Sequence, residues 1–174
     1  MSEVILISGS NRKGNTEYIL NKLNEYIENS ELSLLKNKDI QYCKGCLACH
    51  HISRCVIKDD INLIIEQLIE ANLIVFGVPN YFDNVSGLFK NFMDRLHPLY
   101  KSQLLKDKKV VFVYVGGGGE NGTKQELHQT IKGFEKYLSL DIKNEFSFKA
   151  LNTEDIKKQE EKIEQMANEI KKYI

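Results

Sequence analysis

The chain has 174 residues, and its 24 lysine and arginine side chains balance 24 aspartates and glutamates, so the formal net charge at neutral pH is zero. This balance provides no electrostatic attraction for nucleic acid or for an anionic membrane surface. No secretory leader is apparent and no apolar run approaches the roughly 20 residues that a membrane span requires, so we expect one cytoplasmic domain, residues 1–174, that binds neither nucleic acid nor a membrane.

The first predicted strand, about 3–8, leads into the loop Ser8–Thr16 and then into a helix expected over about 16–29. The loop carries two glycines among small polar residues, so consecutive backbone N–H groups can face an anion beside the positive end of the helix dipole. A nucleoside-triphosphate loop would carry a lysine where Asn15 stands. The loop therefore predicts a site for one terminal phosphate, such as that of FMN, with a turn that binds nothing as the alternative.

A second strand is expected over about 31–36, and all four cysteines follow it between positions 43 and 55. This layout is poor for stapling a fold of this size and good for a local metal or redox site, so we expect reduced thiols or thiolate ligands. After the cysteines, Asp59 and Asp60 can cap a helix with an apolar isoleucine and leucine face.

The third strand is expected over about 73–76, fully buried, and to end in a loop over 77–84. Ser86 can cap the helix that follows this loop, because a serine side chain at that position accepts hydrogen bonds from the first turn.

The fourth strand, about 109–115, leads into four consecutive glycines and then a helix opened by the capping box Thr123-x-x-Glu126. Each glycine costs backbone entropy and buries no side chain, so either close approach of the main chain to a flat ligand or a flexible surface loop accounts for the run. A fifth strand near 142–148 and a last helix over about 154–172 complete the pattern.

Strands that alternate with helices predict an α/β fold in which a parallel sheet carries helices on both faces. Right-handed crossovers leave few strand orders, of which we expect the five-stranded, doubly wound order 2-1-3-4-5. Ligands of such sheets bind beyond the carboxyl ends of the strands, between the first and third strands. The phosphate loop and the loop after the third strand occupy those positions.

The phosphate loop resembles that of the flavodoxin-like NAD(P)H-dependent FMN reductase and quinone reductase family, and so does the segment Pro79-x-Tyr81-Phe82-x-x-Val85-Ser86-Gly87-x-x-Lys90-x-Phe92-x-Asp94-Arg95. The resemblance covers most of the chain. It implies a flavodoxin-like fold, FMN as cofactor and NAD(P)H as electron donor. Asn11 replaces the family's proline, which changes the stiffness of the loop but removes no phosphate donor.

By this resemblance the FMN site has two parts. Its phosphate side comprises Ser8, Ser10, Asn11, Arg12, Gly14, Asn15 and Thr16. Its ring side comprises Pro79, Asn80, Tyr81, Phe82, Gly116, Gly117, Gly118 and Gly119. Taken as residues, Arg12 can also lie on the surface, but its place in the phosphate loop favours the phosphate. The aromatic pair at 81 and 82 can also pack in the core, but its place beside the switch point favours the flavin.

The cysteines have the spacing Cys43-x-x-Cys46-x-x-Cys49-x5-Cys55. A structural zinc site usually joins two separated Cys-x-x-Cys pairs, whereas three cysteines at this spacing are typical of a 4Fe-4S ligand run. The motif resembles that of the iron-sulfur flavoproteins, a branch of the same family with FMN and one 4Fe-4S cluster per subunit. Three alternatives stay open for these cysteines: they bind a cluster, they bind a zinc ion, or they are thiols that bind nothing or form disulfides.

Histidines are not assigned as ligands. His50 and His51 adjoin the motif without being required by it, and His97, His128 and Lys90 are expected to be structural or solvent-facing.

The function implied by the resemblance is hydride transfer from a nicotinamide to FMN, with a small-molecule or electron-transfer protein acceptor and no catalytic side chain of its own. Members of that family are usually dimers or tetramers, so the resemblance also implies a homodimer or homotetramer. A flavodoxin-type electron carrier is the alternative, although such carriers are acidic and this chain is neutral. A flavin-free cysteine module that binds metal or senses redox state is a third possibility.

Overall fold

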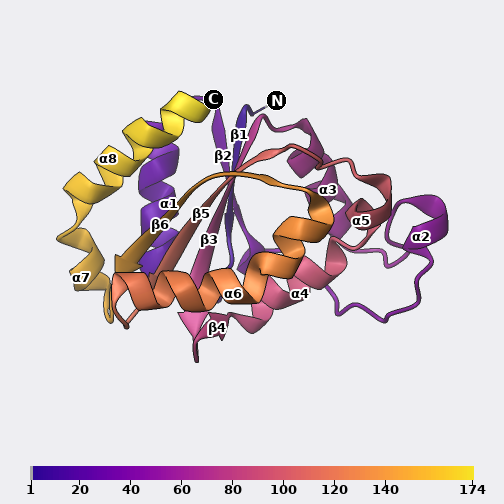
Figure 1. Ribbon diagram of the computed structural model, residues 1–174, viewed down its shortest axis with the longest axis horizontal. Coiled ribbons are helices and arrows are strands. Elements are labelled where there is room, and N and C mark those ends of the chain that lie inside the picture. The colour runs from indigo at the N-terminus through magenta and orange to yellow at the C-terminus, as the bar shows by residue number, and fades with distance from the viewer. Residues whose placement is uncertain (1) are drawn as a thin grey trace.

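A sheet of five parallel strands forms the centre of the computed structural model, which describes residues 2–174 (Figure 1). The order of the long strands, β2-β1-β3-β5-β6, is the expected order 2-1-3-4-5, and the short strand β4 pairs antiparallel with the end of β3. The strands are β1 (Val4–Ser8), β2 (Ser30–Leu34), β3 (Leu73–Tyr81), β4 (Asn84–Val85), β5 (Lys109–Gly116) and β6 (Asp141–Lys149).

Helices cover both faces of the sheet. They are α1 (Asn15–Tyr26), α2 (Cys49–Ile52), α3 (Ile61–Glu70), α4 (Gly87–Arg95), α5 (Pro98–Ser102), α6 (Glu120–Leu138), α7 (Thr153–Lys157) and α8 (Glu160–Ile170), with 3₁₀ turns at Leu35–Asn37 and Lys171–Tyr173. Figure 1 shows α1 and α8 on one side of the sheet and α3 and α4 on the other. No helix in the described part of the chain is long and apolar enough to cross a membrane.

The two layers of core follow from the alternation of side chains along the strands. In β1, Val4 and Leu6 belong to the apolar cluster with α1 and α8, whereas Ile5 and Ile7 belong to the cluster with α3, α4 and α6. Because both of their faces are buried, the central strands β1, β3 and β5 are nearly continuous apolar runs, as parallel strands usually are, whereas the edge strands β2 and β6 are partly exposed.

The third strand is longer than expected. It continues through Gly77 to Tyr81, because Gly77, Val78 and Pro79 pair with β5 and the last two residues pair with β4. Glycine, proline and asparagine are depleted in strands, so the sequence pattern predicted a loop there, and partner strands on both sides override it.

Helix boundaries differ from expectation at three places. Helix α1 ends at Tyr26, three residues early, because the backbone becomes extended at its C-cap, Ile27, and then turns through a left-handed conformation at Asn29. Helix α6 begins at Glu120 with Gly119 as its N-cap, so the predicted capping box was wrong and Thr123 is a buried interior residue. The last helix is two helices, and α7 begins with a capping box between Asn152 and Asp155.

Candidate functional site

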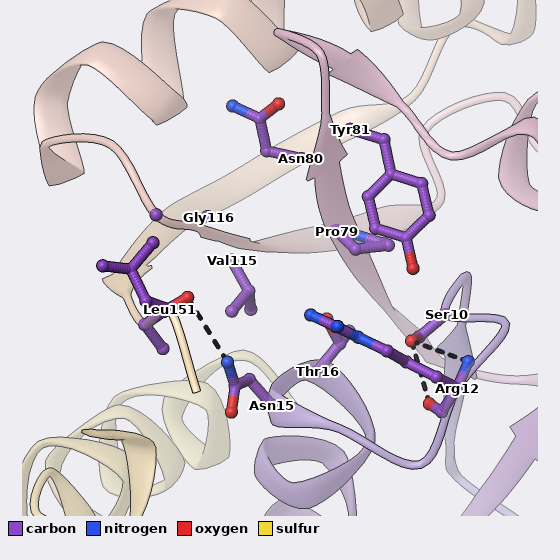
Figure 2. Close-up of a pocket in the computed structure, with 12 residues that line it drawn as sticks. Ser10, Arg12, Asn15, Thr16, Pro79, Asn80, Tyr81, Val115, Gly116 and Leu151 are labelled. Carbon is purple, nitrogen blue, oxygen red and sulfur yellow. Dashed lines mark hydrogen bonds between the residues drawn. The ribbon is translucent and has the colours of Figure 1, made fainter. Parts of the chain in front are cut away.

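A pocket opens at the carboxyl edge of the sheet, where β1, β3, β5 and β6 end side by side (Figure 2). Its lining comes from the loop after β1, the end of β3, the end of β5 and the segment after β6. The lining residues are Ser10, Arg12, Asn15, Thr16, Pro79, Asn80, Tyr81, Val115, Gly116, Gly117, Ala150 and Leu151. Segments far apart in the sequence thus form one site.

The start of the phosphate loop is fixed to the neighbouring elements through its backbone. Gly9 N–H donates to the Gly77 carbonyl at 2.9 Å, and Ser86 Oγ donates to the Gly9 carbonyl at 2.6 Å. A Cβ at position 9 would lie 2.7 Å from the ring of Phe89, which is a fully buried core residue. Ser86 also caps α4 as expected, since its Oγ accepts from Phe89 N–H at 3.1 Å. The loop therefore has one defined position against β3 and α4.

The middle of the loop surrounds the start of α1. Ser10 Oγ donates to the Arg12 carbonyl at 3.0 Å, which folds the loop back on itself. Gly14 is the N-cap of α1 and no side chain caps this end of the helix in the described structure. Figure 2 shows the Arg12 side chain reaching across the pocket above Thr16. A free helix N-terminus and a guanidinium group thus adjoin the same space, which favours an anion.

Asn15 ties the loop to the opposite wall of the pocket. Its Nδ2 donates to the Ala150 carbonyl at 3.3 Å, while its buried Oδ1 has no hydrogen-bond partner among residues 2–174. A buried acceptor without a donor lowers stability. A ligand that donates a hydrogen bond to Asn15 Oδ1 would remove this cost.

The wall of the pocket at the end of β5 is made of main chain and small residues. Gly116 is buried, and a Cβ there would lie 2.9 Å from both Asn80 Cβ and Thr123 Oγ1. Its φ is not in the left-handed region, so close packing accounts for this glycine. Figure 2 shows Tyr81 and Leu151 on opposite sides of the opening.

Some predicted site residues do not line the pocket. Ser8 is buried in β1, Gly14 lies behind the Arg12 side chain, and Asn11, Gly118 and Gly119 are exposed outside it. Phe82 is fully exposed, because Phe82 and Asp83 form the two-residue turn between β3 and β4 with φ of 53° and 57°. This geometry is that of a type I′ turn, which points the phenyl ring into solvent.

Sequence reasoning missed three residues of the pocket lining, Val115, Ala150 and Leu151. The available signal was topological, since the carboxyl end of the fifth strand must lie at the same edge as those of the first and third. The side chains there are apolar and carry no motif of their own.

The cysteine segment lies apart from this pocket, beside α4 and α5. Cys43 and Cys46 are exposed, Cys49 and Cys55 are partly buried, and all four are free thiols that line a second, apolar pocket with Arg95 and His97. Cys49 is the first residue of the one-turn helix α2.

Arg95 anchors the segment at both ends. Its guanidinium is almost fully buried and donates to both carboxylate oxygens of Asp59 at 2.6 and 2.9 Å, to the Gln41 carbonyl, and to Cys55 Sγ at 3.3 Å. Burial raises the pKa of the Asp59 carboxyl, but hydrogen bonds from Arg95 and from the N–H groups of Gln41 and Ile61 outweigh it, so the pKa lies below its usual value. The buried ion pair between Arg95 and Asp59 therefore holds the cysteine segment in place, where regular secondary structure does not.

His97, expected only to be structural or solvent-facing, lies beside the cysteines. Its Nδ1 is 3.5 Å from Cys49 Sγ and 3.2 Å from His50 Nε2. Burial raises the pKa of the Cys49 thiol, and burial together with His97 lowers the pKa of His50. Nearly fifty residues separate His97 from the cysteines, so no local sequence signal links them. His128 bonds Glu145 at 2.8 Å and Lys90 pairs with Asp94, as expected of structural and surface residues.

The chain is similar in sequence to proteins of one known family. The family model described as NADPH-dependent FMN reductase matches residues 2–153. An iron-sulfur flavoprotein of Archaeoglobus fulgidus is 36% identical over 124 residues, which cover 69% of this chain and 61% of that protein. Another, of Methanocaldococcus jannaschii, is 37% identical over 134 residues, which cover 72% of this chain and 69% of that protein. The match to the Archaeoglobus protein thus spans less than two thirds of its length.

Solved structures agree in fold. A putative quinone reductase from Klebsiella pneumoniae has a TM-score of 0.74 at 12% identity, covering 98% of this chain and 85% of that one. An FMN-dependent NADH-azoreductase from Bacillus anthracis in complex with FMN has a TM-score of 0.68 at 17% identity, covering 96% and 98%. The chain has the flavodoxin-like fold and belongs to the NADPH-dependent FMN reductase family.

Proposed function

We propose that this chain is an FMN-dependent oxidoreductase that takes electrons from NAD(P)H and passes them to a small-molecule or protein acceptor. The observation that carries the proposal is the pocket at the carboxyl edge of the sheet, in which the loop 8–16, the end of β3 and the end of β5 meet. This is the ligand position of doubly wound sheets, and the family of the chain is one of FMN reductases.

The phosphate side of the pocket fits a phosphate monoester. Thr16 offers a hydroxyl group, Ser10 offers another if it releases the Arg12 carbonyl, α1 offers an uncapped N-terminus, and Arg12 offers a positive charge in the same space. Arginine recognises phosphate through two parallel hydrogen bonds, and the helix terminus adds backbone donors. The unpaired Oδ1 of Asn15 requires a donor, which a ribityl hydroxyl group supplies.

The ring side of the pocket fits a flat aromatic group. Gly116 and Gly117 bring bare main chain to the wall, and Tyr81 brings an aromatic ring and a hydroxyl group. Planar ligands bury well against such surfaces because main chain and aromatic faces are flat.

The chain's own residues bind the cofactor and orient it. When bound, FMN supplies hydride acceptance and electron transfer. None of the lining residues in the described chain is a histidine, a cysteine, a lysine or a carboxylate. The protein therefore contributes phosphate anchoring, positioning of the reacting atoms and exclusion of water, rather than a side-chain acid or base.

We further propose that Cys43, Cys46, Cys49 and Cys55 hold a 4Fe-4S cluster. Four free thiols on one segment are the donor set of such a cluster, and the Arg95 hydrogen bond to Cys55 Sγ fits a thiolate ligand. The relatives in Archaeoglobus and Methanocaldococcus carry the name iron-sulfur flavoprotein. A homodimer or homotetramer is the assembly we propose, to be checked by light scattering.

Anaerobic purification tests both cofactors. We expect a flavin absorption spectrum, iron and acid-labile sulfide, and oxidation of NADH or NADPH with free flavin or quinone as acceptor. Protein that cannot be reconstituted with FMN overturns the proposal, and flavin-loaded protein without turnover above background favours an electron carrier.

A matched pair of variants tests the phosphate site. Arg12→Gln should weaken FMN binding by about 10- to 100-fold, since a hydrogen bond to a charged group contributes about 1.5–3 kcal/mol. Lys13→Gln removes the same charge from the neighbouring exposed position, which lies outside the pocket, and should change affinity less than about twofold. Equal effects would assign Arg12 to the general field of the loop rather than to the phosphate.

A further inference from the structure

Three potential metal ligands outside the FMN pocket converge beside the cysteine pocket. Cys49 and His50 come from α2, and His97 comes from the residue before α5. Cys49 Sγ, one nitrogen of His50 and one nitrogen of His97 all lie within 4.8 Å of one another. His97 is the N-cap of α5, and α2 and α5 contact each other, so the arrangement is a property of the fold.

Two of the three separations match those around a tetrahedral ion, and the third, between Cys49 Sγ and a His50 nitrogen, lies within 4.8 Å. With metal–sulfur bonds of about 2.3 Å and metal–nitrogen bonds of about 2.05 Å, tetrahedral angles place sulfur and nitrogen about 3.5 Å apart and two nitrogens about 3.3 Å apart. The structure has 3.5 Å between Cys49 Sγ and His97 Nδ1, and 3.2 Å between His50 Nε2 and His97 Nδ1.

The donor chemistry selects a class of ion. One thiolate with two imidazoles suits zinc and its neighbours in the first transition row, whereas magnesium and calcium prefer oxygen ligands. Cys43, Cys46 and Cys55 do not belong to the three-residue group, so a tetrahedral ion held by that group would take water as its fourth ligand.

We propose that Cys49, His50 and His97 bind one divalent ion of the zinc class when the cysteine segment carries no cluster. On binding, the Cys49 thiol releases its proton to solvent and forms a bond from sulfur to the metal, and no electrons are transferred. The ion and a cluster both need the Cys49 sulfur, so they exclude each other; this competition rests on the cluster assignment above, whereas the site itself does not. Zinc-class ions would then hold the segment in a form that cannot accept a cluster.

Cobalt titration of the full chain, freed of iron and kept anaerobic, tests the site. We expect one equivalent of Co²⁺ to bind with thiolate-to-cobalt charge-transfer absorption and the intense visible bands of tetrahedral cobalt, and Zn²⁺ to displace it. An unmodified chain that binds no cobalt, or binds it with only weak octahedral bands, overturns the proposal.

The histidines provide a matched comparison. His97→Asn and His50→Asn should each weaken cobalt binding at least about 100-fold, since loss of an outer-shell partner alone typically costs 10–100-fold. His51→Asn changes the adjacent exposed residue of α2, outside the group, and should leave affinity within about twofold. Thermal melting of each apoprotein checks the fold. If both site variants fold and bind as tightly as the His51 variant, the assignment fails.

The cysteines separate this site from the cluster. Cys43→Ser should prevent cluster reconstitution, measured as iron and sulfide, but keep tetrahedral cobalt binding, and Cys49→Ser should lose both. His97→Asn should lose cobalt and keep the cluster. Loss of cobalt in the Cys43 variant together with its retention in the His97 variant would place the ion among the cysteines alone and overturn the proposal, whatever the outcome for the cluster.

Discussion

The two candidate sites are held in different ways. The FMN pocket lies on the ends of paired strands, and its phosphate loop is fixed through backbone groups such as Gly9 N–H and the Gly9 carbonyl. The cysteine segment has little regular structure, and side chains of distant residues hold it. Arg95 and Asn91 of α4 donate to the carbonyls of Gln41 and Ile40, and Asn62 of α3 bonds both backbone groups of Cys55.

This difference has a physical consequence. Backbone contacts survive most substitutions, so the pocket depends on the sheet as a whole. The cysteine segment depends on a few buried polar side chains, each of which leaves unpaired partners behind when it is removed. We therefore expect single substitutions that damage the cysteine segment while sparing the pocket.

Arg95→Met gives the largest expected effect. It leaves the Asp59 carboxylate buried without its counter-ion and should lower the free energy of unfolding by about 3–5 kcal/mol. Urea unfolding measures the change, and Lys90→Met, which breaks an exposed pair with Asp94, should cost less than about 1 kcal/mol. FMN affinity of folded protein should stay within about twofold. If the variant lost flavin binding as well, the two sites would not be held independently.

Asp59→Asn probes the same ion pair through pH. The folded pKa of Asp59 is lowered, so its stabilising effect is present above the ordinary aspartate pKa and is lost as pH falls through the folded value. At pH 7 the variant should be less stable by about 3 kcal/mol, because Arg95 keeps a buried charge. Urea midpoints of the variant and the unmodified chain should stay apart from pH 7 to about pH 4 and begin to converge below it. Parallel curves would show that the carboxylate charge contributes nothing.

Gly116→Ala tests the main-chain wall of the pocket. Its Cβ would contact Asn80 and Thr123 at 2.9 Å, and such overpacking should cost about 1–3 kcal/mol and weaken FMN binding. Gly119→Ala adds the same methyl group in open space, with φ already at −68°, and should cost only the about 0.5–1 kcal/mol by which alanine is a poorer helix N-cap than glycine. Thermal melts and flavin titrations of the two variants should differ; a tolerated alanine at 116 would mean that Asn80 moves freely.

Phe82→Asn gives the smallest expected effect, and in the opposite direction. Phe82 is exposed in a left-handed conformation, which asparagine adopts more readily in a type I′ turn. Stability should rise by about 0.4–1 kcal/mol by thermal unfolding. A decrease would show that the ring is covered, and light scattering of the variant would then report whether a second copy covers it.

Local patterns predicted most of the sheet and the phosphate loop. The apolar runs of β1, β3 and β5 are long and β-branched, and the loop after β1 carries its glycines and hydroxyl residues in one contiguous stretch, so eight or nine residues suffice to indicate an anion site. The end of β3 was missed, because Gly77 and Pro79 disfavour strands and are kept extended by pairing with β5 and, at Gly77, also with β1. The same limit applies to Thr123, whose capping pattern is overridden by a helix that begins at Glu120.

The sequence by itself determined the fold class, the strand order, the phosphate loop and the cluster of four cysteines, because each depends on residue types that recur at short and regular spacing. Only the tertiary structure decided that Ala150 and Leu151 complete the pocket, that Phe82 faces away from it, and that Arg95 and His97 stand beside the cysteines. Those contacts join residues about 40 to 135 positions apart through side-chain directions set by packing. No local spacing carries that information, because a side chain's direction is fixed only when the elements around it have assembled.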